Sequence, residues 1–116
     1  YEDWVKPGAT YISLSRREMD PAGWAAFDKV VIDDWVCNMA GKEFNAMLDA
    51  GQFSREQLHG EICDVVTERV AGRENDDERI LIHTIGMVSQ DVAICHYVYE
   101  KAKERNMGIV LPPTDA

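Results

Sequence analysis

One stretch constrains the fold of this chain more than any other: a strand-length apolar run that stops at a glycine and leads into a long helix pattern. Residues 79–84 predict a strand and Gly86 a tight turn. Residues 89–106 predict a helix that carries Asp91 in its first turn. In an open α/β sheet, ligands bind beyond the carboxyl ends of strands, facing a helix N-terminus. This unit is therefore the most direct candidate for a small-molecule site.

The rest of the chain predicts two more strands and several helices. Residues 9–14 are β-rich, and the continuously apolar residues 29–32 are typical of a strand buried in a parallel sheet. Helices are expected to begin at Asp20, to cover residues 36–48, and to run over residues 54–66 from a capping box. The order β-α-β-α-α-β-α predicts an α/β parallel sheet with crossover helices. Because three strands are few for such a sheet, we expect this chain to be part of a larger one.

Composition excludes several classes of function. The 116 residues are 46% apolar, enough for the core of one domain or part of one. Twelve basic against twenty-one acidic residues give a net charge of -9, so we expect neither nucleic acid nor an anionic membrane as a partner. No apolar run approaches the roughly 18 residues of a membrane span. Three widely spaced cysteines, Cys37, Cys63 and Cys95, favour a reduced, cytoplasmic compartment.

Six short pieces, in order, resemble one known family. No single piece is specific, but their order makes a strong signal. The chain is similar over nearly its whole length to the ornithine cyclodeaminase/mu-crystallin family of NAD(P)-dependent proteins. The pieces are residues 5–9 (Val-Lys-Pro-Gly-Ala), 19–21 (Met-Asp-Pro), 30–34 (Val-Val-Ile-Asp-Asp), 58–62 (Leu-His-Gly-Glu-Ile), 72–78, and 84–93.

The resemblance implies an α/β fold that is a partial Rossmann-like, doubly wound parallel sheet. Residues 1–105 would form the distal half of an NAD(P)-binding domain, and residues 106–116 would start the returning C-terminal segment. The glycine-rich pyrophosphate turn and the N-terminal part for substrate binding and dimerisation would lie outside this chain. The cofactor would be NAD or NADP, and the full-length enzyme a homodimer in amino-acid metabolism. The chain alone would be inactive.

The segment after the first strand distinguishes branches of that family. Residues 13–18 (Ser-Leu-Ser-Arg-Arg-Glu) are shorter than in cyclodeaminases and lack their catalytic aspartate. They resemble the opine-like dehydrogenases of N-substituted amino acids that serve 2,3-diaminopropionate synthesis. The resemblance thus implies an oxidoreductase that transfers hydride from an amino acid or N-substituted amino acid. The alternatives are an ornithine cyclodeaminase, which releases ammonia, and a non-catalytic dinucleotide-binding protein like mu-crystallin.

Candidate site residues lie where two predicted strands end. His83 is the catalytic candidate, because a histidine beside a nicotinamide can relay a proton during hydride transfer; the alternative is a hydrogen-bonded histidine in a sheet. The cofactor contacts would be backbone groups, hydroxyls and one guanidinium, and Gly86 would allow close approach. The candidate cofactor-binding residues are Ser13, Leu14, Arg16, Thr84, Ile85 and Gly86.

Other polar residues have a structural interpretation beside the functional one. Arg17 could bind a phosphate or carboxylate, or lie in a solvated loop, and Asp91 could orient a substrate amine or stabilise the helix dipole. Residues 33–34 and 76–78 could be paired carboxylates, but acidic runs in loops are usually solvated. Residues 59–61 (His-Gly-Glu) lack the Pro-Cys-x-x-Cys partner of a zinc site, so we expect no metal.

Overall fold

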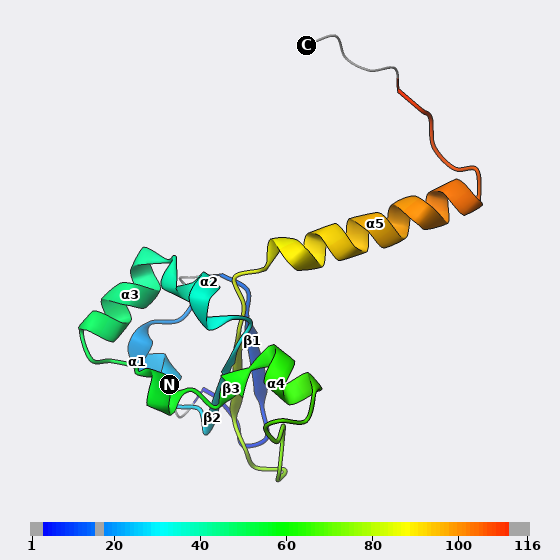
Figure 1. Ribbon diagram of the computed structural model, residues 1–116. Helices are drawn as coiled ribbons and strands as arrows, with labels where there is room; N and C mark the ends of the chain where they lie inside the picture. The colour runs from blue at the N-terminus through cyan, green and yellow to red at the C-terminus, as the bar shows by residue number, and fades with distance from the viewer. Residues whose placement is uncertain (1–3, 16–17, 112–116) are drawn as a thin grey trace. The chain divides into compact units, whose positions relative to one another are not determined.

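A computed structural model describes residues 4–15 and 18–111 of the chain, and these residues form two compact units. The first, Tyr1–Gly86, holds a four-stranded sheet with short helices (Figure 1). Its elements are β1 (Thr10–Ser13), α1 (Pro21–Trp24), β2 (Lys29–Ile32), α2 (Trp35–Met39), α3 (Lys42–Asp49), the 3-10 helix η1 (Arg55–Gln57), β3 (Gly60–Glu61), α4 (Ile62–Val66) and β4 (Ile80–His83).

The second unit, Met87–Ala116, contains the helix α5 (Val88–Glu104). Asp91 lies in its first turn and Lys101 and Lys103 in its last, the charge placement that a helix dipole favours. Asn106 and Gly108 follow with positive φ, as expected at a helix C-terminus. Among the helices that the structure describes, none is long and apolar enough to cross a bilayer.

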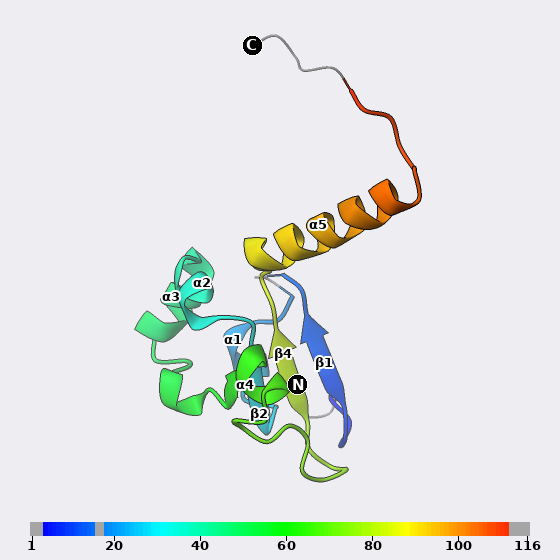
Figure 2. The ribbon, with the colours of Figure 1, turned by 45° about the vertical axis from the view of Figure 1, so that its right-hand side comes forward.

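The sheet has the strand order β1-β4-β2-β3, and every pair is parallel. The predicted parallel α/β arrangement is therefore confirmed, with β3 as a fourth strand that the sequence did not indicate. In the register, His83 lies between Ser13 on β1 and Ile32 on β2. The carboxyl ends of these strands consequently meet at one edge of the sheet (Figure 2).

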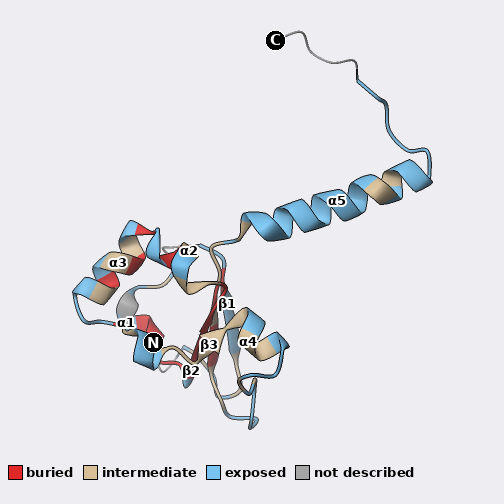
Figure 3. Ribbon diagram, in the orientation of Figure 1, coloured by how far each residue is buried: buried red, intermediate tan, exposed pale blue. Residues whose placement is uncertain are grey.

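One face of the sheet carries the core. Figure 1 shows α1, α2 and α3 gathered on this face and α4 on the other. Val30 and Leu81 point into the core, and burying a side chain such as Leu81 contributes about 1.5–3 kcal/mol. Figure 3 shows the buried positions concentrated along the central strands and the inner sides of these helices. The other buried members of the cluster are Trp24, Ala26, Phe27, Phe44, Met47 and Phe53.

Two helix predictions differ from the structure. The predicted helix over residues 36–48 is divided at Gly41 into α2 and α3, because glycine is a poor helix former and here serves as the N-cap of α3. The predicted helix over residues 54–66 is interrupted, with η1 and α4 at its two ends. His59 N–H donates to the Val30 carbonyl, and Gly60 and Glu61 pair with β2. Hydrogen bonding to a buried strand here outweighs the helical spacing of the apolar residues.

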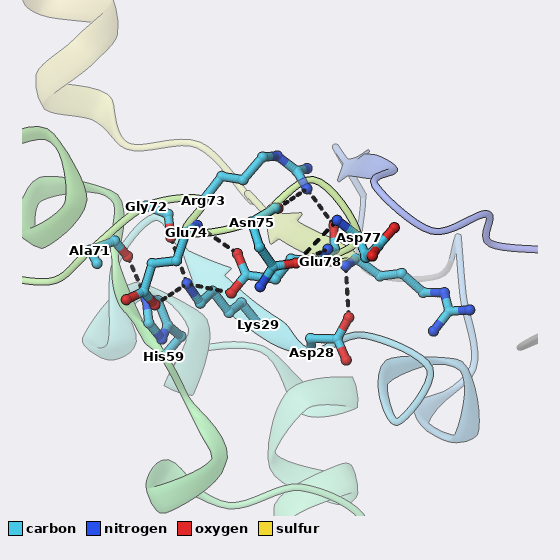
Figure 4. Close-up of polar contacts among 11 residues, drawn as sticks. Asp28, Lys29, His59, Ala71, Gly72, Arg73, Glu74, Asn75, Asp77 and Glu78 are labelled. Carbon is cyan, nitrogen blue, oxygen red and sulfur yellow. Dashed lines mark hydrogen bonds and ion pairs between the residues drawn. The ribbon is translucent and has the colours of Figure 1, made fainter.

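A buried lysine holds the amino end of β2 (Figure 4). Lys29 Nζ lies 2.6 Å from Glu74 Oε2, 3.0 Å from Glu78 Oε1 and 2.6 Å from the Gly72 carbonyl oxygen. The Glu74 hydrogen bond raises the pKa of Lys29, and the Glu74 backbone N–H, together with Lys29, lowers the pKa of Glu78. Only 12% of the Glu78 side chain is exposed. The expectation that the acidic run at residues 76–78 is solvated is therefore wrong for Glu78.

The loop at Gly8 generates a first prediction. Gly8 has φ +77°, its N–H donates to the Asp77 carbonyl at 2.9 Å, and a Cβ would collide with the Asp76 carbonyl oxygen. Gly51 also has positive φ, +67°, but open space around it. We expect Gly51→Ala to cost about 1–2 kcal/mol of unfolding free energy. Gly8→Ala should cost about 1–3 kcal/mol more, measured by urea unfolding. Equal losses would contradict the collision.

The lysine cluster generates a pH prediction. Because the folded pKa of Glu78 lies below its ordinary 4.5, its stabilisation is present above pH 4.5 and is lost as the pH falls through the folded value. Because the folded pKa of Lys29 lies above its ordinary 10.5, the stabilisation that Lys29 contributes is lost only as the pH rises beyond 10.5. Glu78→Gln should therefore lower the thermal midpoint at neutral pH and flatten the decline below pH 4.5. Asp76→Asn, on an exposed neighbour, should do neither.

Candidate functional site

The carboxyl edge of the sheet brings together polar groups from three strands. Ser13 ends β1, His83 ends β4, and Asp33 follows β2; all three are buried, with exposures of 3%, 5% and 3%. The turn at residues 84–86 leaves β4 at the same edge. Buried polar groups are concentrated at this edge because parallel strands end there together, and such an edge is where open α/β sheets bind ligands.

His83 is joined to Ser13 by a hydrogen bond. Its Nδ1 lies 3.1 Å from Ser13 Oγ, and that hydroxyl donates to the Ser15 carbonyl at 3.1 Å. Since a hydroxyl has a single proton, Ser13 Oγ then accepts from His83 Nδ1. The ring also packs on Trp24, with centroids 5.1 Å apart. This arrangement suits either a proton relay or a satisfied core histidine.

Asp33 is a buried carboxylate that sequence reasoning did not place in the site. One oxygen accepts from the backbone N–H groups of Ile85 and Gly86, both at 2.8 Å. The other accepts from the Asn38 amide at 2.8 Å and from Asp34 N–H at 3.0 Å. The sequence signal for Asp33 was its position directly after a buried strand. Asp34 follows the same strand, so this signal could not tell which of the two acids lies in the site.

The turn after β4 is held on two sides. Thr84 N–H donates to the Ser13 carbonyl at 2.9 Å, which ties the turn to β1. The Ile85 and Gly86 N–H groups are already bound by Asp33, so we expect a ligand to meet the carbonyl oxygens of the turn and not these donors. Gly86 has φ +84°, and apart from its chain neighbours no described atom lies within 4 Å of where its Cβ would stand. The turn therefore leaves open space at the position where the sequence predicts the close approach of a ligand.

A cavity of about 450 Å³ opens beside Ser13 and His83 and falls within the first unit, while Asp33 and residues 84–86 are not among its lining residues. Ser13, His83 and Trp24 line it from the sheet and α1, and Phe44 and Met47 line it from α3. Most of its lining surface is apolar, as in typical small-molecule sites, although seven of the twelve lining residues have polar side chains. The remaining lining residues are Ser15, Met19, Asp20, Asn38, Glu43, Ala46 and Gln52.

The other predicted cofactor contacts have different outcomes. The Leu14 side chain is 69% exposed, and its backbone N–H donates to Glu18 Oε2 at 3.0 Å, so only its backbone is near the edge. Arg16 and Arg17 lie outside the described residues. Ser13 and the turn at residues 84–86 are the predicted contacts that the structure brings together.

Asp34 has a structural role. Its carboxylate accepts from Cys37 N–H at 2.6 Å and caps α2, and this backbone hydrogen bond lowers the pKa of Asp34. The Cys37 thiol, facing the same carboxylate, has its pKa raised. The two adjacent acids are therefore not a catalytic pair: one binds the turn and the other caps a helix.

One group of possible metal ligands lies elsewhere in the described part of the chain. Glu61, Cys63 and Asp64 have ligand atoms within 4.8 Å of one another. Glu61 and Asp64 form the capping box of α4, and Arg69 pairs with Asp64 at 2.7 Å. His59 instead bonds to the Ala71 carbonyl at 2.6 Å. A helix cap with its own cation explains the group without a metal.

Comparison with known proteins identifies relatives of the chain. Residues 1–106 match the model of the ornithine cyclodeaminase/mu-crystallin family. The N-((2S)-2-amino-2-carboxyethyl)-L-glutamate dehydrogenase of Staphylococcus aureus is 37% identical over 110 residues, which are 94% of this chain and 33% of the relative. The alanine dehydrogenase of Archaeoglobus fulgidus is 35% identical over 80 residues, 69% of this chain and 25% of that protein. The chain thus spans about a third or less of these relatives.

Solved structures share the fold. An archaeal alanine dehydrogenase dimer with bound NAD aligns with a TM-score of 0.78 at 29% identity, over 95% of this chain and 36% of that one. The Thermococcus litoralis Δ1-pyrroline-2-carboxylate reductase in complex with NADH and L-proline aligns with a TM-score of 0.79 at 24% identity, over 95% of this chain and 36% of its own. The predicted partial Rossmann-like sheet is confirmed.

Proposed function

The chain belongs to the ornithine cyclodeaminase/mu-crystallin family, and we propose that it is the distal part of a longer NAD(P)-dependent oxidoreductase. The substrate would be an amino acid or an N-substituted amino acid. The observation that carries this proposal is the edge where the buried Ser13 and His83 meet the turn at residues 84–86, in a chain 37% identical to a dehydrogenase of an N-substituted amino acid.

The residues at this edge fit a nicotinamide ring. Gly86 leaves open space at a positive-φ position, and the turn presents carbonyl oxygens that can accept from a carboxamide N–H. Ser13, Thr84, Ile85 and Gly86 would hold the ring, with Leu14 contributing through its backbone. Arg16 would bind a phosphate. When bound, NAD or NADP would accept the hydride that the substrate carbon releases.

His83 would handle the proton. Oxidation of an amine at its α-carbon removes a hydride from carbon and a proton from nitrogen, and water then splits the resulting imine into an oxo acid and an amine. His83 Nδ1 lies 3.1 Å from Ser13 Oγ at the end of β1, and the imidazole would take up the substrate proton at this edge. Trp24 packs against the ring and would keep its orientation.

The rest of the protein would complete this half domain. Residues 1–105 would be the distal half of the dinucleotide domain and residues 106–116 the start of a returning segment. Tyr11 and Ile12, on the outermost described strand β1, are 36% and 56% exposed, which supports an upstream part that pairs with and covers this strand. The chain alone would be inactive, because the pyrophosphate turn and the substrate-carboxylate ligands would lie in that part.

Assembly and compartment are further parts of the proposal. We infer a homodimer, supported by the archaeal alanine dehydrogenase, which is a dimer. We infer a cytoplasmic location, supported by three free thiols at Cys37, Cys63 and Cys95.

The function is tested on the full-length protein. We expect NADH or NADPH fluorescence to change on binding, and reduced nicotinamide to form from NAD⁺ or NADP⁺ with N-(2-amino-2-carboxyethyl)-glutamate, alanine or proline as substrate. Ammonia released from ornithine without net reduction would instead indicate a cyclodeaminase. Tight dinucleotide binding without turnover of any of these would indicate a binding protein, and no binding of either dinucleotide would overturn the proposal.

The role of His83 is tested by His83→Gln. If His83 relays the proton, kcat should fall about 10²–10⁴-fold while the Kd of the dinucleotide changes little. His59→Gln is the matched control, because His59 bonds to the Ala71 carbonyl away from the site. An unchanged kcat in folded His83→Gln would assign His83 to packing and to its bond with Ser13.

A further inference from the structure

The buried carboxylate of Asp33 has no part in the chemistry above, yet it joins two segments of the site. We propose that Asp33 is a positioning residue that fixes the turn at residues 84–86 and thereby sets the affinity for the dinucleotide. The effect on dinucleotide affinity rests on the proposed function. The fixing of the turn by Asp33 does not.

The geometry assigns each carboxylate oxygen to a different segment. Oδ2 accepts from the Ile85 and Gly86 N–H groups, 52 and 53 residues away in the sequence. Oδ1 accepts from the N–H of Asp34, the N-cap of α2, and from the side-chain amide of Asn38 within α2. Each oxygen thus accepts two hydrogen bonds, and the side chain links α2 to the turn after β4. We refer to this set of four hydrogen bonds as the Asp33 clamp.

Burial of the carboxylate strengthens the clamp. Asp33 is 3% exposed and Asn38 is 1% exposed, so water competes little for the bond between them, whereas Ile85 is half-buried and Gly86 is exposed. Within residues 4–15 and 18–111, no lysine or arginine pairs with Asp33, and its charge is met by N–H donors. Hydrogen bonds to a charged acceptor are roughly twice as strong as neutral ones. A buried carboxylate held in this way has one low-energy position.

The turn needs such a constraint. Gly86 has φ +84°, and glycine populates many other conformations at little cost. Without the clamp, the Ile85 and Gly86 N–H groups would lose their acceptor, and the turn could reorient to find water. Its carbonyl oxygens, which would receive the nicotinamide carboxamide, would then no longer be preorganised. Asp33 acts only through this backbone, so it is a positioning and not a catalytic residue.

Asp34 provides a matched control. It is an adjacent acid on the same segment, but its carboxylate accepts from Cys37 N–H and caps α2. Removing it should loosen the first turn of α2 and leave the Ile85 and Gly86 amides bound. Variants at Asp33 and Asp34 therefore separate the loss of the clamp from general damage to this segment.

The experiment compares Asp33→Asn and Asp33→Ala with Asp34→Asn and Asp34→Ala in the full-length protein. Asp33→Ala should accelerate hydrogen exchange at the Ile85 and Gly86 amides about tenfold or more, and raise the NADH Kd by a similar factor. Asp33→Asn should be intermediate, because a neutral oxygen can still accept from the turn. KM for the dinucleotide should rise more than kcat falls. The Asp34 variants should change neither the exchange nor the Kd.

The outcomes separate the two halves of the inference. Unchanged exchange and Kd in a folded Asp33→Asn protein, with native circular dichroism, would overturn the clamp, and this variant decides the matter if Asp33→Ala does not fold. Faster exchange with an unchanged Kd would overturn the link to the dinucleotide. If the wild-type protein binds neither NADH nor NADPH, the proposed function fails, and the exchange measurement alone still decides the clamp.

Discussion

The candidate site depends on the parallel pairing of β4 between β1 and β2. This register places His83 beside Ser13 on one side and Ile32 on the other, so the residues that follow each strand emerge at a single edge. An antiparallel β4 would send its turn to the opposite edge, away from Asp33. The bond of His83 to Ser13 and the bonds of Asp33 to Ile85 and Gly86 are consequences of this pairing, since they join residues far apart in the sequence.

The two ends of the sheet satisfy their buried charges by opposite means. At the amino end, the Lys29 ammonium lies among carboxylates and a carbonyl from one loop, close to solvent. At the carboxyl end, the Asp33 carboxylate lies among N–H groups and away from any described cation. Ion pairs at the first end hold a loop in place. At the carboxyl end, the Asp33 carboxylate is bound, among the described residues, only by N–H donors. It can therefore position the backbone without placing a side-chain cation beside a bound ligand.

The sequence predicted features that depend on local pattern and missed those that depend on distant partners. The strand at residues 29–32 was predicted to the residue because its apolar run is continuous. The helix over residues 54–66 was wrong as one continuous helix, because pairing of Gly60 and Glu61 with β2 interrupts it between η1 and α4. Ser13, His83 and the glycine turn followed from strand ends. The role of Asp33 could not follow, because its partners lie 52 and 53 residues away.

The outermost described strand, β1, shows how the site can be well formed in a chain that spans about a third of the length of its relatives. Its carboxyl end is fixed from within: Ser13 is 3% exposed and binds His83, and its carbonyl accepts from Thr84 N–H. Its amino end is held by Arg73, which donates to Thr10 Oγ1 at 2.9 Å. Between these anchors Ile12 stays exposed. An upstream strand could therefore pair with β1 without disturbing the hydrogen bonds of the site, because those bonds run toward β4.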